Sequence, residues 1–214
     1  MTPRPYPKQD RKHVVDAGRD KILAAAAEVL NLDDLGAFSL DAVARRAGVT
    51  RMTVYNHFGS KGVLLGEVFD LLVERDAFSG MPTVFEAKDV GGALDALVGM
   101  LGRFYDDNRQ LMLKMVGVAG LDPDLDKVLL EKNLRRRRGI EAILARFGAP
   151  KSPAVDRSEL VNTLDVLLSF HTFNSLAGPD RTPLEVVPHV RRMIRGILGA
   201  PAKPAPKRTP KRAR

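Results

Sequence analysis

Cysteine is absent from this 214-residue chain, and so is tryptophan. The lack of Cys excludes disulfides, thiolate zinc sites and a cysteine nucleophile, and it fits the reducing cytoplasm. No uncharged apolar run approaches the roughly 18 residues of a membrane span, and the first thirteen residues contain no apolar stretch of the kind that secretory signals need. Apolar residues still make up 44% of the chain. We therefore expect a cytoplasmic protein with a substantial core and no membrane partner.

Acidic residues are missing from the C-terminal end, and this explains most of the net charge of +8. Residues 200–214 contain six Lys and Arg and no acid, whereas residues 1–80 hold equal numbers of basic and acidic residues. DNA binding therefore has to be argued from local residues. We predict a flexible basic arm at residues 1–15 and a disordered basic tail at residues 201–214, because both are rich in Pro and poor in large apolar groups. We expect the tail to add a nonspecific, salt-sensitive attraction to DNA.

Strand-like alternation of apolar and polar residues is not sustained anywhere in the chain, and apolar residues instead recur at spacings of three and four. This pattern predicts an all-α fold. Start signals, such as Asp122-Pro123 and the capping box from Thr182 to Glu185, and stop signals at glycine and proline set the expected ends of the helices. The expected helices are 16–31, 39–47, 50–58, 60–77, 89–108, 110–119, 122–147, 156–177 and 182–199.

The segment 39–58, SLDAVARRAGVTRMTVYNHF, carries the sharpest local pattern. Ser39 is suited to cap the first short helix, and Gly48 is suited to the left-handed conformation of a sharp turn out of it. Thr50 is then placed to cap the second short helix. Two short helices joined by a glycine turn form a helix-turn-helix.

The second helix of this motif has two contrasting faces. At about 100° per residue, Val54 and Phe58 share one face, which we expect to point to the core, and Met52 and Asn56 lie almost opposite. A helix of this width fits the DNA major groove. We expect base contacts from Asn56 to adenine and from Met52 to a thymine methyl group, with Arg51 reaching guanine or a phosphate.

The flanks of that helix and the neighbouring turns are polar, which suits contacts to phosphate oxygens. A helix–Gly–helix corner can also be only a corner of a bundle, and a single Tyr or His is often structural. The combination of capped short helices, an apolar 54/58 pair and a polar outer face favours DNA. Arg46 is also expected close to the DNA backbone. The expected phosphate contacts are Arg45, Thr53, Tyr55, His57 and Lys61.

The run from Gly48 to Lys61, GVTRMTVYNHFGSK, resembles the signature of the tetracycline-repressor (TetR) family, G-V-S/T-x-x-T-hydrophobic-Y-x-H-F-x-S/N-K. The resemblance covers roughly residues 16–70. It implies that Thr50, together with residues 53, 55, 57 and 61, fixes the phosphates, and that residues 51, 52 and 56 set the sequence preference. Asp41 departs from the family pattern, because a basic or polar DNA-facing residue sometimes stands there.

The resemblance also implies the domain plan. It predicts a helix-turn-helix DNA-binding domain at 16–78, followed by a larger helical effector-binding and dimerisation domain at 79–200. The helices near 156–177 and 183–199 are then expected to pair across a two-fold axis. Their apolar surface is supplied by Leu160, Leu164, Leu167, Phe170 and Phe173. Such a homodimer would bind a palindromic operator.

The sequence indicates a small-molecule effector pocket less clearly than the other parts of this plan. Apolar residues and a few polar ones fall on the expected inner faces of the middle helices, where plain core is the more frequent role. The candidate pocket residues are Met100, Phe104, Met112, Met115, Phe147, Leu168, His171 and Asn174. The basic run at residues 135–138 fits either a solvated face with one ion pair or a contact to an anion.

Two other classes remain open: a nonspecific architectural DNA-binding protein and an all-α enzyme. The chain lacks a Gly-rich phosphate loop, a G-x-S-x-G elbow and an HExxH motif, so we expect no enzyme, no cofactor and no metal site. The predicted function is a sequence-specific DNA-binding transcription regulator associated with the nucleoid, and more specifically a repressor that an effector releases.

Overall fold

The computed structural model describes residues 8–32, 38–76, 80–148 and 156–199. Within these ranges the chain is all-α, as predicted, and no strand is present. None of the described helices is long and apolar enough to cross a membrane. In chain order the helices are α1 (Lys8–Leu32), α2 (Leu40–Ala47), α3 (Arg51–Phe58), α4 (Lys61–Asp76), α5 (Met81–Phe85), α6 (Val90–Asp107), α7 (Arg109–Ala119), α8 (Pro123–Phe147), α9 (Arg157–Leu167), α10 (Phe170–Ala177) and α11 (Val187–Ile197).

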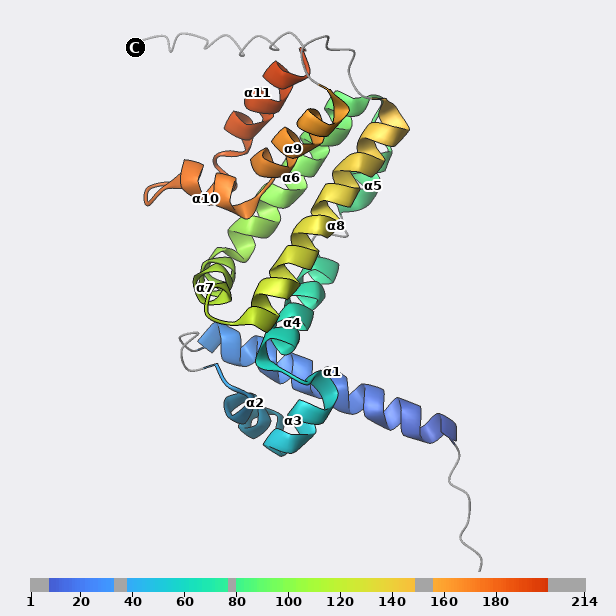
Figure 1. Cartoon of the computed structure of the whole chain (residues 1–214), viewed down its shortest axis with the longest axis vertical. Helices are drawn as coiled ribbons and strands as arrows, with labels where there is room; N and C mark the ends of the chain where they lie inside the picture. The colour runs from blue at the N-terminus through green and yellow to red at the C-terminus, as the bar shows by residue number, and fades with distance from the viewer. Residues whose placement is uncertain (1–7, 33–37, 77–79, 149–155, 200–214) are drawn as a thin grey trace, which may run out of the picture. The chain divides into compact units, whose positions relative to one another are not determined.

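The helices pack into two compact units, and the first consists of residues 1–79 and 104–138. In this unit α1 packs on α2 and α4, and α3 packs on α2 and α4 (Figure 1). Its core contains fully buried side chains from α1, from α2 to α4 and from Phe38, two residues before α2. They include Ile22, Phe38, Val43, Val54 and Leu64, each no more than 1% exposed.

Helix α4 lies very close to α8 within the same unit. A Cβ added to Gly62 would lie 2.4 Å from the amide nitrogen of Leu125, and one added to Gly66 would lie 2.4 Å from Val128 Cγ1. Real side chains do not tolerate such distances. The two glycines of α4, four residues apart and therefore on one face, allow this close approach.

The second unit consists of residues 80–103 and 139–214, and its described part contains α5, α9, α10 and α11 with portions of α6 and α8. Helix α11 packs on α9 and also against α6, where Arg191 donates to the backbone carbonyl of Asp95. Arg195 forms an ion pair with the carboxylate of Asp95. These contacts attach the last helix to a segment about a hundred residues earlier in the chain.

Several helix boundaries differ from those predicted. Helix α1 begins at Lys8, so residues 8–15, predicted to be part of a flexible arm, are helical. The last proline of that region is Pro7, and the helix formers that follow continue the pattern backwards. The rest of the arm, residues 1–7, and the tail 201–214 lie outside the described residues. The short helix α5 was not predicted from the sequence.

The helix predicted at 156–177 is two helices, α9 and α10. Ser169 interrupts it with an extended backbone (φ −76°, ψ 151°), and its hydroxyl accepts a hydrogen bond from the Thr172 amide at 3.2 Å. A serine in this conformation caps a new helix and does not continue the old one. Asp156 caps the start of α9, because its carboxylate accepts from the Ser158 and Glu159 amides.

The last helix begins later than predicted, although its capping box is present. The Thr182 amide donates to Glu185 Oε2 at 2.8 Å, and the Glu185 amide donates to Thr182 Oγ1 at 3.3 Å. Residues 183–186 nevertheless form a turn, and α11 starts at Val187. Pro188 has no amide hydrogen to donate to the carbonyl of Leu184. A continuous α-helix therefore does not start at Pro183.

Candidate nucleic-acid interface

Local capping builds the turn between α2 and α3 as predicted. Ser39 Oγ accepts from the Ala42 amide at 3.1 Å, and Thr50 Oγ1 accepts from the Thr53 amide at 3.1 Å. Gly48 has a left-handed backbone with φ 64°, and its amide bonds back to the end of α2. A side chain at this φ is strained, which accounts for glycine at the corner.

The orientation of α3 is also as predicted. Val54 is completely buried and Phe58 is 5% exposed. On the opposite side Met52 is 65% exposed and Asn56 is exposed, and on one flank Tyr55 is 54% exposed. The apolar face of α3 is therefore used inside the unit, and its polar face is open.

The two threonines at the start of α3 present their hydroxyls together. Thr50 is exposed and Thr53 is half-buried, and their Oγ1 atoms lie 2.8 Å apart. One hydroxyl donates to the other, and Thr50 Oγ1 also caps the Thr53 amide. Both hydroxyls retain lone pairs or a donor for a further partner, as a phosphate contact requires.

Two of the predicted phosphate-binding residues also pack inside the unit. Lys61 Nζ lies 5.7 Å from the centre of the Phe38 ring. His57 is half-buried, and its Nε2 lies 3.9 Å from the position that a Cβ on Gly18 of α1 would take. Their side chains are thus held in place by neighbours, which limits the conformational entropy that a DNA contact would cost.

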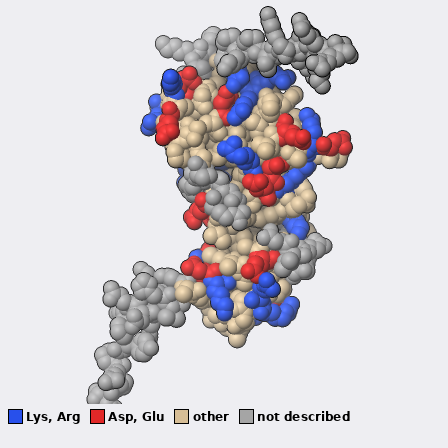
Figure 2. Space-filling model, turned by 180° about the vertical axis from the view of Figure 1, so that it is seen from behind, with Lys and Arg blue, Asp and Glu red and all other residues tan. Residues whose placement is uncertain are grey.

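The arginines near the motif differ in their partners. Arg45 is exposed, while Arg46 Nε pairs with Glu28 of α1 at 2.5 Å. Arg51, at the first position of α3, has its Nε 3.6 Å from Asp41 Oδ2 of α2. Figure 2 shows Lys and Arg side chains at the end of the first unit that carries α2 and α3, with Asp and Glu side chains beside them.

One basic residue at this site was missed by sequence reasoning. Lys21 is exposed on α1, and its Nζ lies 3.8 Å from the position that a Cβ on Gly48 would occupy. The ammonium group therefore reaches the turn of the helix-turn-helix. The periodicity of α1 marks Lys21 only as an outward-facing residue, because its proximity to the turn depends on how α1 crosses α2.

The same segment is the part of the chain that matches a known protein family. The family model for "Bacterial regulatory proteins, tetR family" matches residues 22–68, which contain the helix-turn-helix and the first half of α4. This segment is therefore similar to the DNA-binding part of the TetR family. AlkX of Mycobacterium tuberculosis, an HTH-type transcriptional regulator, is 46% identical over 109 residues, which are 49% of this chain and 44% of AlkX. The match thus spans less than half the length of that relative.

Solved structures extend the similarity beyond the motif. A protein from Streptomyces coelicolor superimposes with a TM-score of 0.63 at 20% identity, over 85% of this chain and 98% of the other. PfmR, a TetR-family regulator from Thermus thermophilus, has a TM-score of 0.56 at 23% identity, over 85% and 99% of the two chains. These similarities concern the fold, and they confirm the predicted helical architecture.

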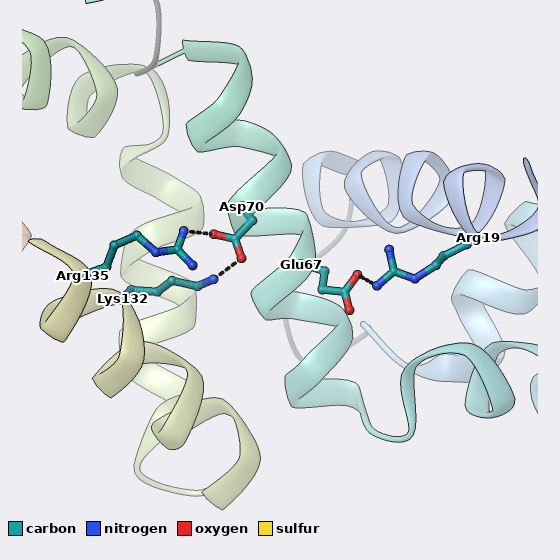
Figure 3. A network of polar contacts seen from close by, with 5 residues as sticks. All are labelled: Arg19, Glu67, Asp70, Lys132 and Arg135. Atoms are coloured by element: carbon teal, nitrogen blue, oxygen red, sulfur yellow. Dashed lines mark hydrogen bonds and ion pairs between the residues drawn. The ribbon is translucent and has the colours of Figure 1, made fainter. Parts of the chain in front are cut away.

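Helix α4 follows the helix-turn-helix, and ion pairs link it to α1 on one side and to α8 on the other (Figure 3). Glu67 pairs with Arg19 of α1, and Asp70, three residues later, pairs with Lys132 and Arg135 of α8. Arg135 Nη1 lies 2.7 Å from Asp70 Oδ1. The basic run at residues 135–138 therefore contains an ion-pair partner, as one of its two interpretations expected.

The residues predicted to line an effector pocket divide between the two units. Phe104, Met112 and Met115 belong to the first unit and are buried. In the second unit Met100 and Leu168 are buried, while Phe147 and Asn174 are half-buried. A role in effector binding remains a prediction for these seven.

His171, the eighth, does not face inward in the described chain. It is exposed on α10, so the expectation that it lies on an inner face is wrong. Phe170, Phe173 and Ala177 form the buried side of this helix, and at about 100° per residue position 171 falls outside it. Apolar residues nearby, Leu168, Phe170 and Phe173, concealed the break at Ser169 in the sequence.

The predicted dimerisation surface also needs correction. Leu160, Leu164, Phe170 and Phe173 are between 0% and 4% exposed within the single chain, and Leu167 is half-buried. They build the core of the second unit, because α9 and α10 pack against each other and against their neighbours. The exposed apolar residue on α9 is Val166, at 63%.

Proposed function

We propose that this chain is a sequence-specific DNA-binding transcription regulator of the TetR family that acts in the cytoplasm on the nucleoid, as a homodimer on a palindromic operator. Repression relieved by a small-molecule effector is the finer form of the same proposal. The regulatory family and the regulator AlkX support this class over an all-α enzyme.

The observation that carries the proposal is the open face of α3. Val54 and Phe58 hold the helix on the unit, so Met52 and Asn56 project away from it. The major groove is about 12 Å wide and admits one helix, and base edges there present distinct donors and acceptors. Asn56 is suited to pair with adenine, and Met52 is suited to contact a thymine methyl group.

Phosphate contacts would fix the register of α3 in the groove. Thr50 and Thr53 offer hydroxyls at the start of the helix, and Tyr55 offers one on the opposite flank. Lys61 and His57 add donors at its end. The exposed Arg45 is suited to the neighbouring phosphates. Such contacts position a protein on the duplex but carry no sequence information by themselves.

A homodimer would place two copies of α3 about one DNA turn apart, roughly 34–36 Å, on the two halves of a palindrome. We assign the dimer contact to the outer faces of α9 to α11. Val166 offers exposed apolar surface there, and His189 and Arg192 are exposed on α11. The exposed His171 of α10 fits the same contact.

The test begins with selection of bound fragments from genomic DNA by the full-length protein, followed by gel-shift titration. A regulator should prefer its selected palindrome over a scrambled duplex by about 10³-fold or more at physiological salt. Equal affinity for both duplexes would indicate an architectural protein and overturn the proposal. Light scattering of the complex should give two protein chains per duplex, and small molecules are then screened for release of the selected fragment.

A further inference from the structure

The ion pair between Asp41 and Arg51 joins the two helices of the motif on its open side. Asp41 lies in the first turn of α2, and Arg51 is the first residue of α3. Their side chains are 55% and 68% exposed, and Arg51 Nε lies 3.6 Å from Asp41 Oδ2. The pair is thus available to anything that binds the exposed surface of the helix-turn-helix.

The position of Arg51 is unfavourable for the stability of its own helix. The N-terminus of a helix carries a partial positive charge, and a cation in the first turn is repelled by it. Thr50 caps α3, and Arg51 cannot, because its guanidinium has no acceptor for the backbone amides. Asp41 offsets this repulsion and also holds the guanidinium beside α2.

The chemistry of the guanidinium defines what remains for a ligand. Arginine has five N–H donors, and the Asp41 carboxylate lies nearest to Nε. The four N–H donors of the two terminal nitrogens are left to bind another group. Two parallel N–H groups match the O6 and N7 acceptors of guanine in the major groove.

An exposed carboxylate beside this surface also opposes unspecific binding. Phosphate oxygens that approach Asp41 are repelled, and each duplex meets this repulsion whatever its sequence. A duplex that offers guanine to Arg51 gains a favourable contact that offsets this repulsion. A duplex without guanine gains no such contact. Specificity arises from such a difference between correct and incorrect partners.

We propose that Asp41 is a specificity-determining positioning residue, which orients Arg51 toward a guanine in each half of the operator. This inference rests on the proposed DNA-binding function. The acidic residue that departs from the family pattern is then part of the recognition surface.

The experiment compares four full-length proteins by selection from a random duplex library: wild type, Asp41→Asn, Arg51→Ala and Glu28→Gln. The last variant is a matched control, because it removes the same charge from another exposed ion pair of the helix-turn-helix unit, between Glu28 and Arg46. We expect the wild type to require guanine at one position of each half-site. In Asp41→Asn and Arg51→Ala the preference for guanine over the other bases at that position should fall by about tenfold, which is within the range of a bidentate base contact.

Affinity for a scrambled duplex separates the two variants. It should rise about two- to fivefold in Asp41→Asn, where a repulsive charge is lost, and fall in Arg51→Ala. Glu28→Gln should keep the guanine requirement. If Asp41→Asn melts at a lower temperature, Asp41→Glu serves in its place, because it keeps the charge but moves the carboxylate outward, and it should weaken the same base preference.

The outcomes separate the inference from the function on which it rests. A guanine preference that disappears in Arg51→Ala but persists in Asp41→Asn and Asp41→Glu would overturn the role of Asp41. An unchanged preference in Arg51→Ala would overturn it as well, because Arg51 would then not read a base. Failure of the wild type to enrich any sequence would overturn the proposed function itself.

Discussion

Gly66 of α4 lies directly against Val128 of α8, so closely that a Cβ at position 66 would stand 2.4 Å from Val128 Cγ1. Valine is branched at Cβ and has little freedom to move aside. The close contact of α4 with α8 therefore depends on the absence of a side chain at this position.

Replacing Gly66 with Ala should destabilise the protein by about 1–3 kcal/mol, because the added methyl group overpacks a contact that cannot relax without moving a helix. The control is Gly139→Ala in α8, where no described residue lies within 4 Å of the added Cβ. That change should stabilise the protein by up to about 1 kcal/mol through helix propensity. Urea denaturation followed by circular dichroism measures both, and equal effects would contradict the close contact.

The two cations that share Asp70 should contribute unequally to stability. The Lys132 side chain is 13% exposed and its Nζ lies 5.8 Å from the centre of the Phe69 ring, whereas Arg135 is 59% exposed. Lys132→Ala should cost about 1–2 kcal/mol, since it loses packing of the stem as well as the ion pair. Arg135→Ala should cost less than about 1 kcal/mol, as exposed pairs do.

Denaturation at low salt and at about 1 M salt distinguishes these contributions, because a Debye length near 3 Å at 1 M screens the exposed pair. The cost of Arg135→Ala should then largely vanish, while most of the cost of Lys132→Ala should persist. A larger effect from Arg135 than from Lys132 would argue against the packing described for Lys132.

Substitutions on α3 should affect DNA binding in two distinct ways. Tyr55→Ala and Lys61→Ala should weaken binding to every sequence by a similar factor, because they remove contacts to phosphates. Asn56→Ala should change which base pair is preferred at one position of each half-site, with a penalty of about 1–3 kcal/mol on the original site. Gel-shift titration against single-base variants of the operator gives both quantities. Unchanged binding in all three variants would exclude the proposed placement of α3 in the groove.

Deletion of residues 201–214 tests the predicted role of the basic tail. The deletion removes six positive charges. Each phosphate that the tail neutralises contributes about 0.9 to the slope of log affinity against log salt concentration, so the slope should become shallower. The preferred sequence should stay the same. A slope identical to that of the full chain would show that the tail does not contribute to binding.

Much of the recognition motif was predictable because it is local. The caps at Ser39 and Thr50, the left-handed Gly48 and the inward side of α3 depend on residues at most four positions apart. The sequence predicts such features well, since hydrogen bonds within one turn and the period of the helix determine them.

The errors arose where local signals compete or where the two ends of a contact are far apart in sequence. Ser169 caps a new helix inside an apolar segment, and Pro188 delays a helix whose capping box is complete. The apolar side chains assigned to a dimer surface, such as Leu164, instead fill the core of their own unit. Periodicity identifies an apolar face but not the partner that covers it.

Sequence alone thus determined the helical class, the capped turn and the outward face of α3, because these follow from neighbours along one chain segment. Only tertiary structure decided that Lys21 reaches the turn, that Arg51 meets Asp41 and that α4 packs on α8 through bare glycines. These relationships depend on how helices cross, and the crossing is fixed by packing of the whole unit rather than by any one segment.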